Sequence, residues 1–232
     1  MIVTTVVLVA YRVPASWSPV LAIVRGVVQF AAISVILTGI IESPTWIAVA
    51  LVAMFAVAVA VAVGRAGWSG RAIATMATSI GAGVLTATGL VFATGALDLT
   101  ARYALALGAI IIGNSMTIAA MSARLFTESV SDHWDEVEGW LALGATPRRS
   151  TLGLARRAVR TALIPSIDQT KTTGLVVLPG AFVGAIFGGL SPLAAGRFQI
   201  IVLAAIMAAG AITAVLVAVW MGPIRTKPSP LV

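Results

Sequence analysis

One short stretch of the sequence gathers the side chains that could ligate a metal ion. Asp132, His133, Asp135 and Glu136 place oxygen and nitrogen ligands at helical spacing. His133 is the only histidine and the chain has no cysteine, which excludes multi-histidine sites, thiolate zinc sites and iron–sulfur clusters. The same stretch also suits a solvated helix face or a contact with a partner protein, and we favour this interpretation. We therefore assign no metal ligands from the sequence.

Motifs of hydrolytic enzymes and of nucleotide-binding loops are absent from the sequence. It contains no G-x-x-x-x-G-K-[ST] phosphate-binding loop, no nucleophile elbow and no H-E-x-x-H zinc motif. We expect no catalytic residues, no directly bound cofactor and no enzymatic activity of the chain alone. Any energy from ATP must therefore come from a partner.

Three polar side chains interrupt apolar segments, where they are costly to place in lipid. Asn114 stands between Gly113 and Ser115, and it either hydrogen bonds to a neighbouring helix or lines a path for polar solutes. Gln29, one turn after Arg25, leaves the same two interpretations open. The long side chain of Arg25 can also snorkel to the membrane surface.

Opposite charges stand three residues apart at Asp168 and Lys171, a spacing that allows an ion pair on one helical face. Such a pair costs less to bury than either charge alone, so it is either a structural pair or a lock on a hinge. Pro165 and Pro179 bracket this segment, and a proline inside a membrane helix permits a kink.

Glycines follow Pro179 at every fourth position, namely Gly180, Gly184 and Gly188. This small-x-x-x-small pattern allows two helices to approach closely. The partner helix lies either in a second copy of the chain or in the same subunit, and the pattern does not distinguish the two.

Composition defines the elements that must position these residues. Of the 232 residues, 59% are hydrophobic and 10% are charged, which is typical of an integral membrane protein. A spanning helix needs about 20 mostly apolar residues, and the opening stretch MIVTTVVLVA is a shortened candidate. The longer candidate spans are 26–41, 46–63, 72–96, 103–121, 173–190 and 198–221. We expect an all-α, polytopic protein with about seven transmembrane helices.

The basic residues predict the orientation, because cytoplasmic loops near helix ends carry the excess of positive charge. With seven spans, one side receives Arg12, Arg65, Arg71, Arg124, Arg148, Arg149, Arg156, Arg157, Arg160, Lys171, Arg225 and Lys227. The other side receives Arg102 and Arg197. The C-terminus is then cytoplasmic and the N-terminus lies outside, unless the first segment does not span. This topology explains the net charge of +7, so we expect no nucleic-acid partner.

We expect one domain over residues 1–232 with one long cytoplasmic excursion at about 122–172. Its acidic first half continues the fifth span into the cytosol. Thr146 and Pro147 then signal a new helix, with the hydroxyl as cap and proline at the first position. The arginines of this helix share one face and its apolar residues the other, an arrangement typical of a helix on a membrane surface.

Glu138 precedes Gly144 by six residues, a spacing that resembles the EAA loop of ABC transporter permeases, although Gly139 and Trp140 replace its paired alanines. More broadly, the chain is similar to Fet-type iron-export ABC permeases and their plant aluminium-tolerance relatives. The similarity is carried by Arg25, Gln29, Gly113, Asn114, Met116, 143–147, 162–165, Ile167, Asp168, Lys171, Thr172, 174–176, 178–180, Ser191, Pro192 and Gln199.

This resemblance implies a homodimeric permease in the cell membrane that exports its substrate. Each copy would contact a separate cytoplasmic ATPase, which holds ATP and Mg²⁺. The residues implied in coupling to the ATPase are Glu138, Leu143, Gly144, Ala145, Thr146 and Pro147. The candidates for the translocation pathway are Arg25, Gln29, Asn114, Met116, Asp168, Lys171, Pro179 and Gln199.

The resemblance implies iron or another metal as the substrate. Related metal exporters often carry two methionines after Leu-Pro-Gly, where this chain has Ala181 and Phe182, while Met116 and Met121 remain in the fifth span. A nucleotide sugar or another organic solute is therefore an alternative substrate. A transporter or scaffold that does not use ATP is a further alternative, disfavoured because the predicted spans lack ionisable residues.

Overall fold

The computed structural model describes residues 1–40 and 43–228, without the side chains of 35–40. Ile41, where the second predicted span ends, lies outside this part. The described residues form ten helices and no strand, apart from an isolated bridge between Thr173 and Val177. The prediction of an all-α membrane protein is confirmed. Contacts divide the chain into two compact units, Met1–Ile47 and Ala48–Val232.

The first unit contains α1 (Ile2–Ala10) and α2 (Ser18–Ile40). The turn between them places Arg12 and Ala15 at positive φ values of 55° and 57°. With nine residues, α1 is about 14 Å long, too short to cross a hydrocarbon core of about 30 Å. Apolar residues cover α2 over Ser18–Ser34, and Arg25 and Gln29 are exposed there.

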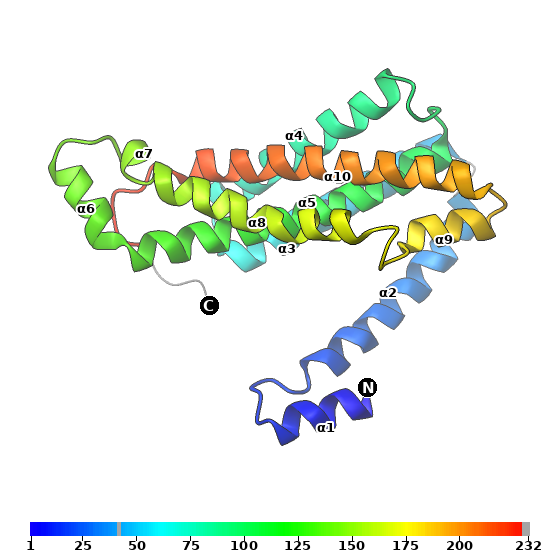
Figure 1. Cartoon of the computed structure of the whole chain (residues 1–232), viewed down its shortest axis with the longest axis horizontal. Coiled ribbons are helices and arrows are strands. Elements are labelled where there is room, and N and C mark those ends of the chain that lie inside the picture. The colour runs from blue at the N-terminus through cyan, green and yellow to red at the C-terminus, as the bar shows by residue number, and fades with distance from the viewer. Residues whose placement is uncertain (41–42, 229–232) are drawn as a thin grey trace. The chain divides into compact units, whose positions relative to one another are not determined.

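The second unit is a bundle of long helices (Figure 1). It comprises most of α3 (Pro44–Ala66), then α4 (Gly70–Ala93), α5 (Ala101–Asp132), α6 (Trp134–Ala142), α7 (Pro147–Ser150), α8 (Leu152–Thr172), α9 (Gly180–Phe187) and α10 (Pro192–Met221). Within the described residues, α3, α4, α5 and α10 are long and apolar enough to cross a membrane.

Local signals start several of these helices. The Ser69 hydroxyl accepts a hydrogen bond from the amide of Ala72 at 3.0 Å, and Thr100 caps α5 in the same way. Ser191 caps α10, and Pro192 occupies its first turn. The predicted extension of the fifth span is confirmed only as far as Asp132, where α5 ends after 32 residues; the rest of the acidic stretch forms the separate helix α6.

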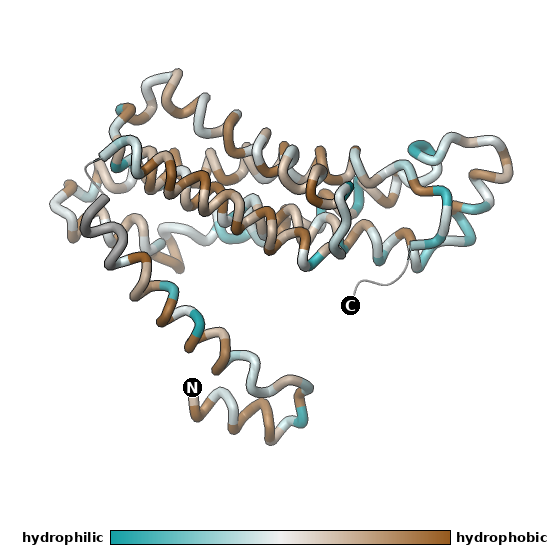
Figure 2. The backbone as a smooth tube through the Cα atoms, turned by 180° about the vertical axis from the view of Figure 1, so that it is seen from behind, coloured by the Kyte–Doolittle hydropathy of each residue, from teal (hydrophilic) through white to brown (hydrophobic). Residues whose placement is uncertain are grey.

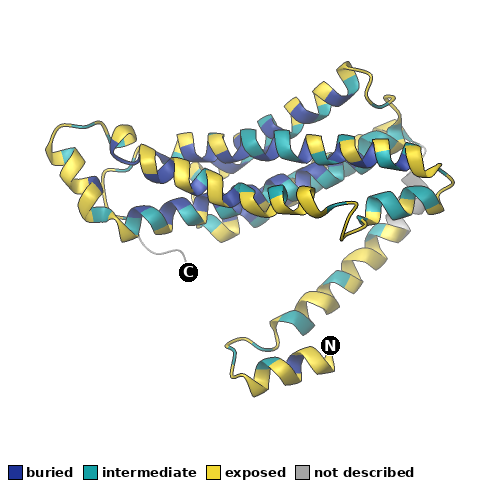
Figure 3. Ribbon diagram, viewed as in Figure 1, coloured by how far each residue is buried: buried dark blue, intermediate teal, exposed yellow. Residues whose placement is uncertain are grey.

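The core lies between α10 and its neighbours α4, α5 and α8 (Figure 3). The helices α4 and α10 approach each other closely where a β-carbon on Gly83 would lie 2.6 Å from the carbonyl oxygen of Ala209. Buried Thr213 donates a hydrogen bond to the carbonyl of Ser79 at 3.3 Å in the same contact. Only glycine leaves room for two helix backbones at this distance.

The predicted position of the basic helix on a membrane surface is wrong. Instead, α8 packs lengthwise against α5 and α10. Its apolar face consists mainly of small residues, with Ala155, Ala158 and Ala162 buried. Such a face lets a helix approach its neighbours closely, which explains why α8 joins the bundle.

The predicted span at 173–190 is also wrong, because the chain is not helical between Thr173 and Pro179. Gly174 takes a φ of +86° just past the end of α8, a conformation that stops a helix. Proline disfavours helical geometry in the residue before it, and Pro179 is the N-cap of the eight-residue α9. Hydropathy alone did not reveal these two breaks.

Candidate functional site

A tight turn connects α6 to the next helix at one end of the bundle. Gly144 has a φ of +87° and donates its amide to the carbonyl of Leu141 at 3.0 Å. Ala145 donates to the carbonyl of Trp140 at 3.0 Å, which completes a Schellman motif. The turn leaves Leu143 81% exposed and Trp140 51% exposed. Apolar side chains displayed beside a rigid turn are suited to contact another protein.

The residues after the turn join this region to α10. Pro147 starts α7 as predicted, but the predicted cap is wrong, since Thr146 makes no side-chain cap bond in the described chain. The helix is interrupted after Ser150, and Thr151 is completely buried. Its hydroxyl donates a hydrogen bond to the carbonyl of Gly222 at 2.7 Å. This contact fixes the start of α8 to the end of α10.

A cleft of about 590 Å³ opens between α6 and the start of α8. Trp140, Leu143 and Gly144 line one part of it, and Glu136 supplies a carboxylate. The basic residues in its lining are Arg149, Arg156 and Arg157. Glu138, the predicted coupling residue, is exposed on α6. The carboxylate among the described residues that line the cleft is that of Glu136. The cleft therefore combines an apolar lip with a mostly cationic wall.

The two predicted faces of α8 are confirmed. Leu154, Ala155, Ala158 and Ala162 are buried, whereas the arginines of the helix are exposed. Near its other end, Lys171 Nζ lies 3.2 Å from Asp168 Oδ1, and both side chains are more than half exposed. An ion pair as exposed as this one adds little stability.

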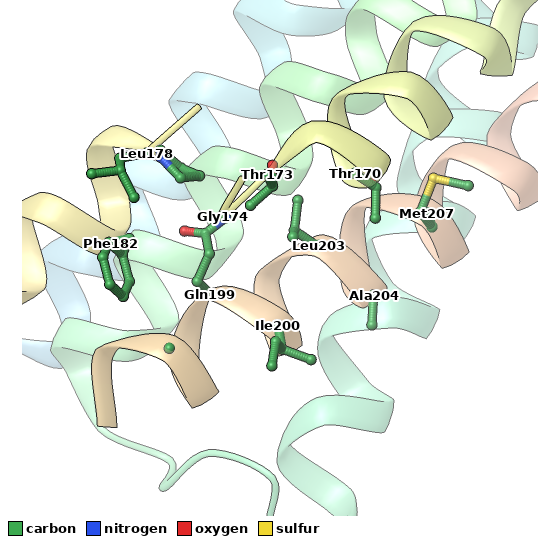
Figure 4. A pocket seen from close by; sticks show the side chains of 12 residues that line it. Thr170, Thr173, Gly174, Leu178, Phe182, Gln199, Ile200, Leu203, Ala204 and Met207 are labelled. Carbon is green, nitrogen blue, oxygen red and sulfur yellow. The ribbon is translucent and has the colours of Figure 1, made fainter. Parts of the chain in front are cut away.

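A pocket of about 570 Å³ lies where α8 ends and the non-helical segment begins (Figure 4). Thr170 lines it from α8 and Thr173 from the position just after this helix. Pro179 and Phe182 line it from the other side of the break, and α10 supplies Gln199 and the apolar wall. The Gln199 side chain extends from α10 toward Thr173 and Gly174. Gln199 is 6% exposed, and its Oε1 has no hydrogen-bond partner among the described residues.

An unpartnered buried amide oxygen is costly, so a ligand or water that donates a hydrogen bond would be stabilised here. Two of the predicted pathway residues, Gln199 and Pro179, thus meet in one pocket, with Asp168 and Lys171 in the adjoining turns of α8. Thr170 and Thr173 were not among the residues predicted from the sequence. The polar run that precedes Gly174 was the signal that could have identified them.

The other predicted residues lie elsewhere. Asn114 donates from Nδ2 to the carbonyl of Ile110 at 2.9 Å, so this contact stays within α5 rather than bridging to another helix. Met116 packs against a buried apolar cluster of α3, α4, α5 and α10. Arg25 and Gln29 belong to the first unit, Met1–Ile47, whereas the pocket beside Gln199 belongs to the second.

The glycine series of α9 does not serve close packing within the described chain. A β-carbon on Gly180 or Gly184 would meet no atom within 4 Å, and one on Gly188 would meet only carbonyls of its own helix. The predicted acidic cluster likewise forms no group of three or more metal-ligating residues in the described part. His133 Nδ1 instead lies 2.9 Å from the carbonyl of Ser129.

Comparison with known proteins places these features in a wider context. A family described as an uncharacterised protein family (UPF0014) matches residues 1–223. The rice "UPF0014 membrane protein STAR2" is 37% identical over 197 residues, which are 84% of this chain and 69% of the rice protein. The Arabidopsis thaliana "Protein ALUMINUM SENSITIVE 3" is 34% identical over 82% of this chain and 71% of its own length.

A bacterial relative matches a shorter stretch. The Escherichia coli K12 "Probable iron export permease protein FetB" is 33% identical over 127 residues, which are 55% of this chain and 48% of that protein. No solved structure gives a significant match.

Proposed function

This chain belongs to the UPF0014 family, and from that membership we propose that it is the membrane-spanning permease subunit of an ABC transporter. The partial similarity to a probable iron export permease supports this function. Iron or another metal species is then the first candidate substrate, moved out of the cell. Two copies form the transporter in the cell membrane, with the C-terminus in the cytoplasm.

The observation that carries this proposal is the Schellman turn at Gly144. Exposed Leu143 and Trp140 lie at the lip of a cleft with a cationic wall. The helix α5 extends beyond its apolar part to Asp132, just before α6, and so leads to the helix that carries Trp140. A soluble ATPase can insert apolar and acidic side chains there. Movement of the turn is transmitted to α8 and α10 through the Thr151–Gly222 hydrogen bond. ATP and Mg²⁺ remain on the ATPase.

An organic anion such as a nucleotide sugar is the second candidate substrate. The cationic exposed residues of α8 favour it, because arginine and lysine lining a path attract anions. The pocket beside Gln199 has no carboxylate, imidazole or thiolate in its described lining, and Met207 supplies its only sulfur there. Hard and borderline metal ions prefer the donors that this lining lacks.

The proposal is tested by purifying the tagged chain from native membranes and assaying the complex for ATP hydrolysis with Fe(II), Fe(III) and UDP-sugars. We expect an ATPase in stoichiometric amount and faster hydrolysis with one substrate class. Purification of the chain without any ATPase would contradict the permease assignment and favour a transporter or scaffold that does not use ATP.

The coupling turn is tested by Gly144→Leu, which places a side chain at a φ of +87°. We expect substrate-stimulated hydrolysis to fall at least tenfold while membrane insertion is unchanged. Gly139→Ala is the matched control, because Gly139 is a helical residue of α6 with open space around it. Glu138→Lys tests the acidic neighbour in the same assay. Normal stimulation in both Gly144→Leu and Glu138→Lys would overturn the assignment of this turn.

A further inference from the structure

A groove of about 550 Å³ lies between α8 and α10, two helices that pack against each other. Thr151 and Gly222 line it at the end where α8 begins and α10 ends. Leu163 lines it farther along, and this side chain also packs at Gly210 of α10. The groove therefore follows the two helices from one end of the bundle into its apolar part.

Three arginines line this basic groove, namely Arg148, Arg156 and Arg160, and its described lining contains no carboxylate. Arg148 lies at the end of α10, because a β-carbon on Gly222 would be 3.9 Å from its Cγ. Arg156 and Arg160 are four residues apart, so they are neighbours on one face of α8. None of the three arginines forms an ion pair with another described residue. The groove thus carries three positive charges that lack a counter-ion in the described chain.

The other part of the lining is apolar and comes from both helices. Val159 and Ile167 belong to α8, while Val215 and Val219 belong to α10. Val215 is 48% exposed and Val219 is 36% exposed. These two valines lie within the last two turns of α10, which is apolar enough to cross a membrane. The apolar part of the groove is therefore within reach of lipid chains near one membrane surface.

A phospholipid matches both parts of the groove. Guanidinium groups donate paired hydrogen bonds to phosphate oxygens, and two arginines one turn apart can share one phosphate. An acyl chain can then cover the exposed valines beside them. Basic pockets between membrane helices bind anionic headgroups in this way. Three positive charges also repel the cationic half of a zwitterionic headgroup, so the groove favours a lipid with net negative charge.

A water-soluble occupant fits less well. An acidic protein segment could pair with the arginines, but a segment with a polar backbone does not follow the valines into hydrocarbon. Arg156 also lines the cleft that contains Glu136, yet these two residues form no ion pair in the described part of the chain. An amphiphile is therefore the occupant that the combined lining favours.

We propose that the basic groove binds one anionic phospholipid, with its phosphate held by Arg156 and Arg160 and an acyl chain along Val215 and Val219. The lipid bridges α8 to α10 beside the Thr151–Gly222 hydrogen bond. It thereby stabilises the joint that connects α7 and the turn before it to the bundle. This inference requires only that the chain lies in a membrane, and it does not depend on the permease function.

Native mass spectrometry of the purified full chain in detergent tests the headgroup. The probes are phosphatidylglycerol and phosphatidylcholine with identical acyl chains. We expect the chain to bind phosphatidylglycerol about tenfold more tightly, because arginines near a membrane surface attract anionic lipids. The double variant Arg156→Gln and Arg160→Gln should lose this preference.

The matched control is the double variant Arg149→Gln and Arg157→Gln. It removes the same charge from neighbouring positions of α7 and α8, but these two arginines line the cleft and not the groove. We expect it to keep the preference for phosphatidylglycerol. An equal loss of the preference in both double variants would overturn the proposal, because it would reflect overall charge rather than this groove.

The acyl chain is tested by Val215→Trp, whose larger side chain fills the apolar part of the groove. Binding of phosphatidylglycerol should weaken about fivefold, since less of the acyl chain is buried. Val57→Trp on α3 is the control, because Val57 is 60% exposed and is not part of the described lining. Binding that is unaffected by Val215→Trp, or that inorganic phosphate abolishes, would show a simple anion site and overturn the lipid assignment.

A partner protein is the remaining occupant that these experiments detect. An ATPase that is lost from the Arg156→Gln and Arg160→Gln variant while phosphatidylglycerol binding persists would assign the groove to that partner and overturn the proposal. Conversely, selective lipid binding by a chain that purifies without any ATPase would support the groove and contradict only the permease function.

Discussion

Single side chains hold the proposed coupling region to the transmembrane bundle. The Thr151 hydroxyl is buried and donates to the carbonyl of Gly222, a contact between residues 71 positions apart. Because Gly222 follows the last residue of α10, this bond joins α7 and α8 to the far end of the chain. Its position makes it a direct link between the region of the Gly144 turn and α10, one of the long apolar helices of the bundle.

Thr151→Val should destabilise the folded chain by about 1 kcal/mol, because the isosteric side chain leaves a buried carbonyl without its donor. We expect a decrease of about 2–4 °C in the melting temperature of the purified protein in detergent. Thr161→Val is the control, since the Thr161 side chain is exposed. Equal melting temperatures for the two variants would show that the Thr151 bond contributes nothing to stability.

Among the helices, the contact between α4 and α10 depends on one glycine. The carbonyl oxygen of Ala209 and the hydroxyl of Thr213 occupy the space that a β-carbon on Gly83 would take. Backbone atoms cannot move aside as a flexible side chain can. A larger residue at Gly83 must therefore separate the two helices.

Gly83→Ala should destabilise the protein by about 1–3 kcal/mol through this overpacking. Gly89→Ala on the same helix should be neutral or stabilising, since open space surrounds Gly89 and alanine favours helices. Thermal unfolding of both variants measures the difference. A Gly83→Ala variant as stable as Gly89→Ala would contradict the close approach of α4 and α10.

Local sequence signals predicted some elements well and others poorly. Pro147 marked a helix start because its ring fixes the required backbone angle. The interruption at Gly174 and Pro179 was missed because hydropathy measures apolarity and not backbone geometry. The packing of α8 into the bundle was missed because it depends on a tertiary contact, in which the Leu163 side chain packs against α10 at Gly210. Gln199 was identified by its resemblance to a residue of the related permeases. The pocket around it could be identified only from the tertiary structure, because its lining comes from separate segments of the chain.

In the second unit as a whole, charge is distributed unevenly along the bundle. Hydrophilic segments gather where α6 and α7 lie (Figure 2). At the same end, Arg71 donates to the carbonyl of Trp220 at 3.0 Å. The helix α4 begins and α10 ends there, so basic residues such as Arg71 lie beside several helix ends at this end of the bundle. The positive-inside rule predicts that this end faces the cytoplasm.

Cysteines introduced at the two ends test this orientation. In intact cells, an impermeant thiol reagent should label Asp98→Cys, which lies in the connection between α4 and α5. It should not label Pro228→Cys, which follows α10, until the membrane is permeabilised. Because the chain has no native cysteine, each signal reports one site. The reverse pattern would invert the proposed topology and place the Gly144 turn outside the cell.

The polar character of α8 also has a consequence for biogenesis. A segment with this many charges is a poor substrate for release into the bilayer from a protein-conducting channel, where each central arginine, lysine or aspartate costs about 2.5–3.5 kcal/mol. Its partner α10 is synthesised later and is strongly apolar. We therefore expect the integration of α8 to wait until α10, against which it packs, has left the ribosome, so that the order of insertion differs from the order of synthesis.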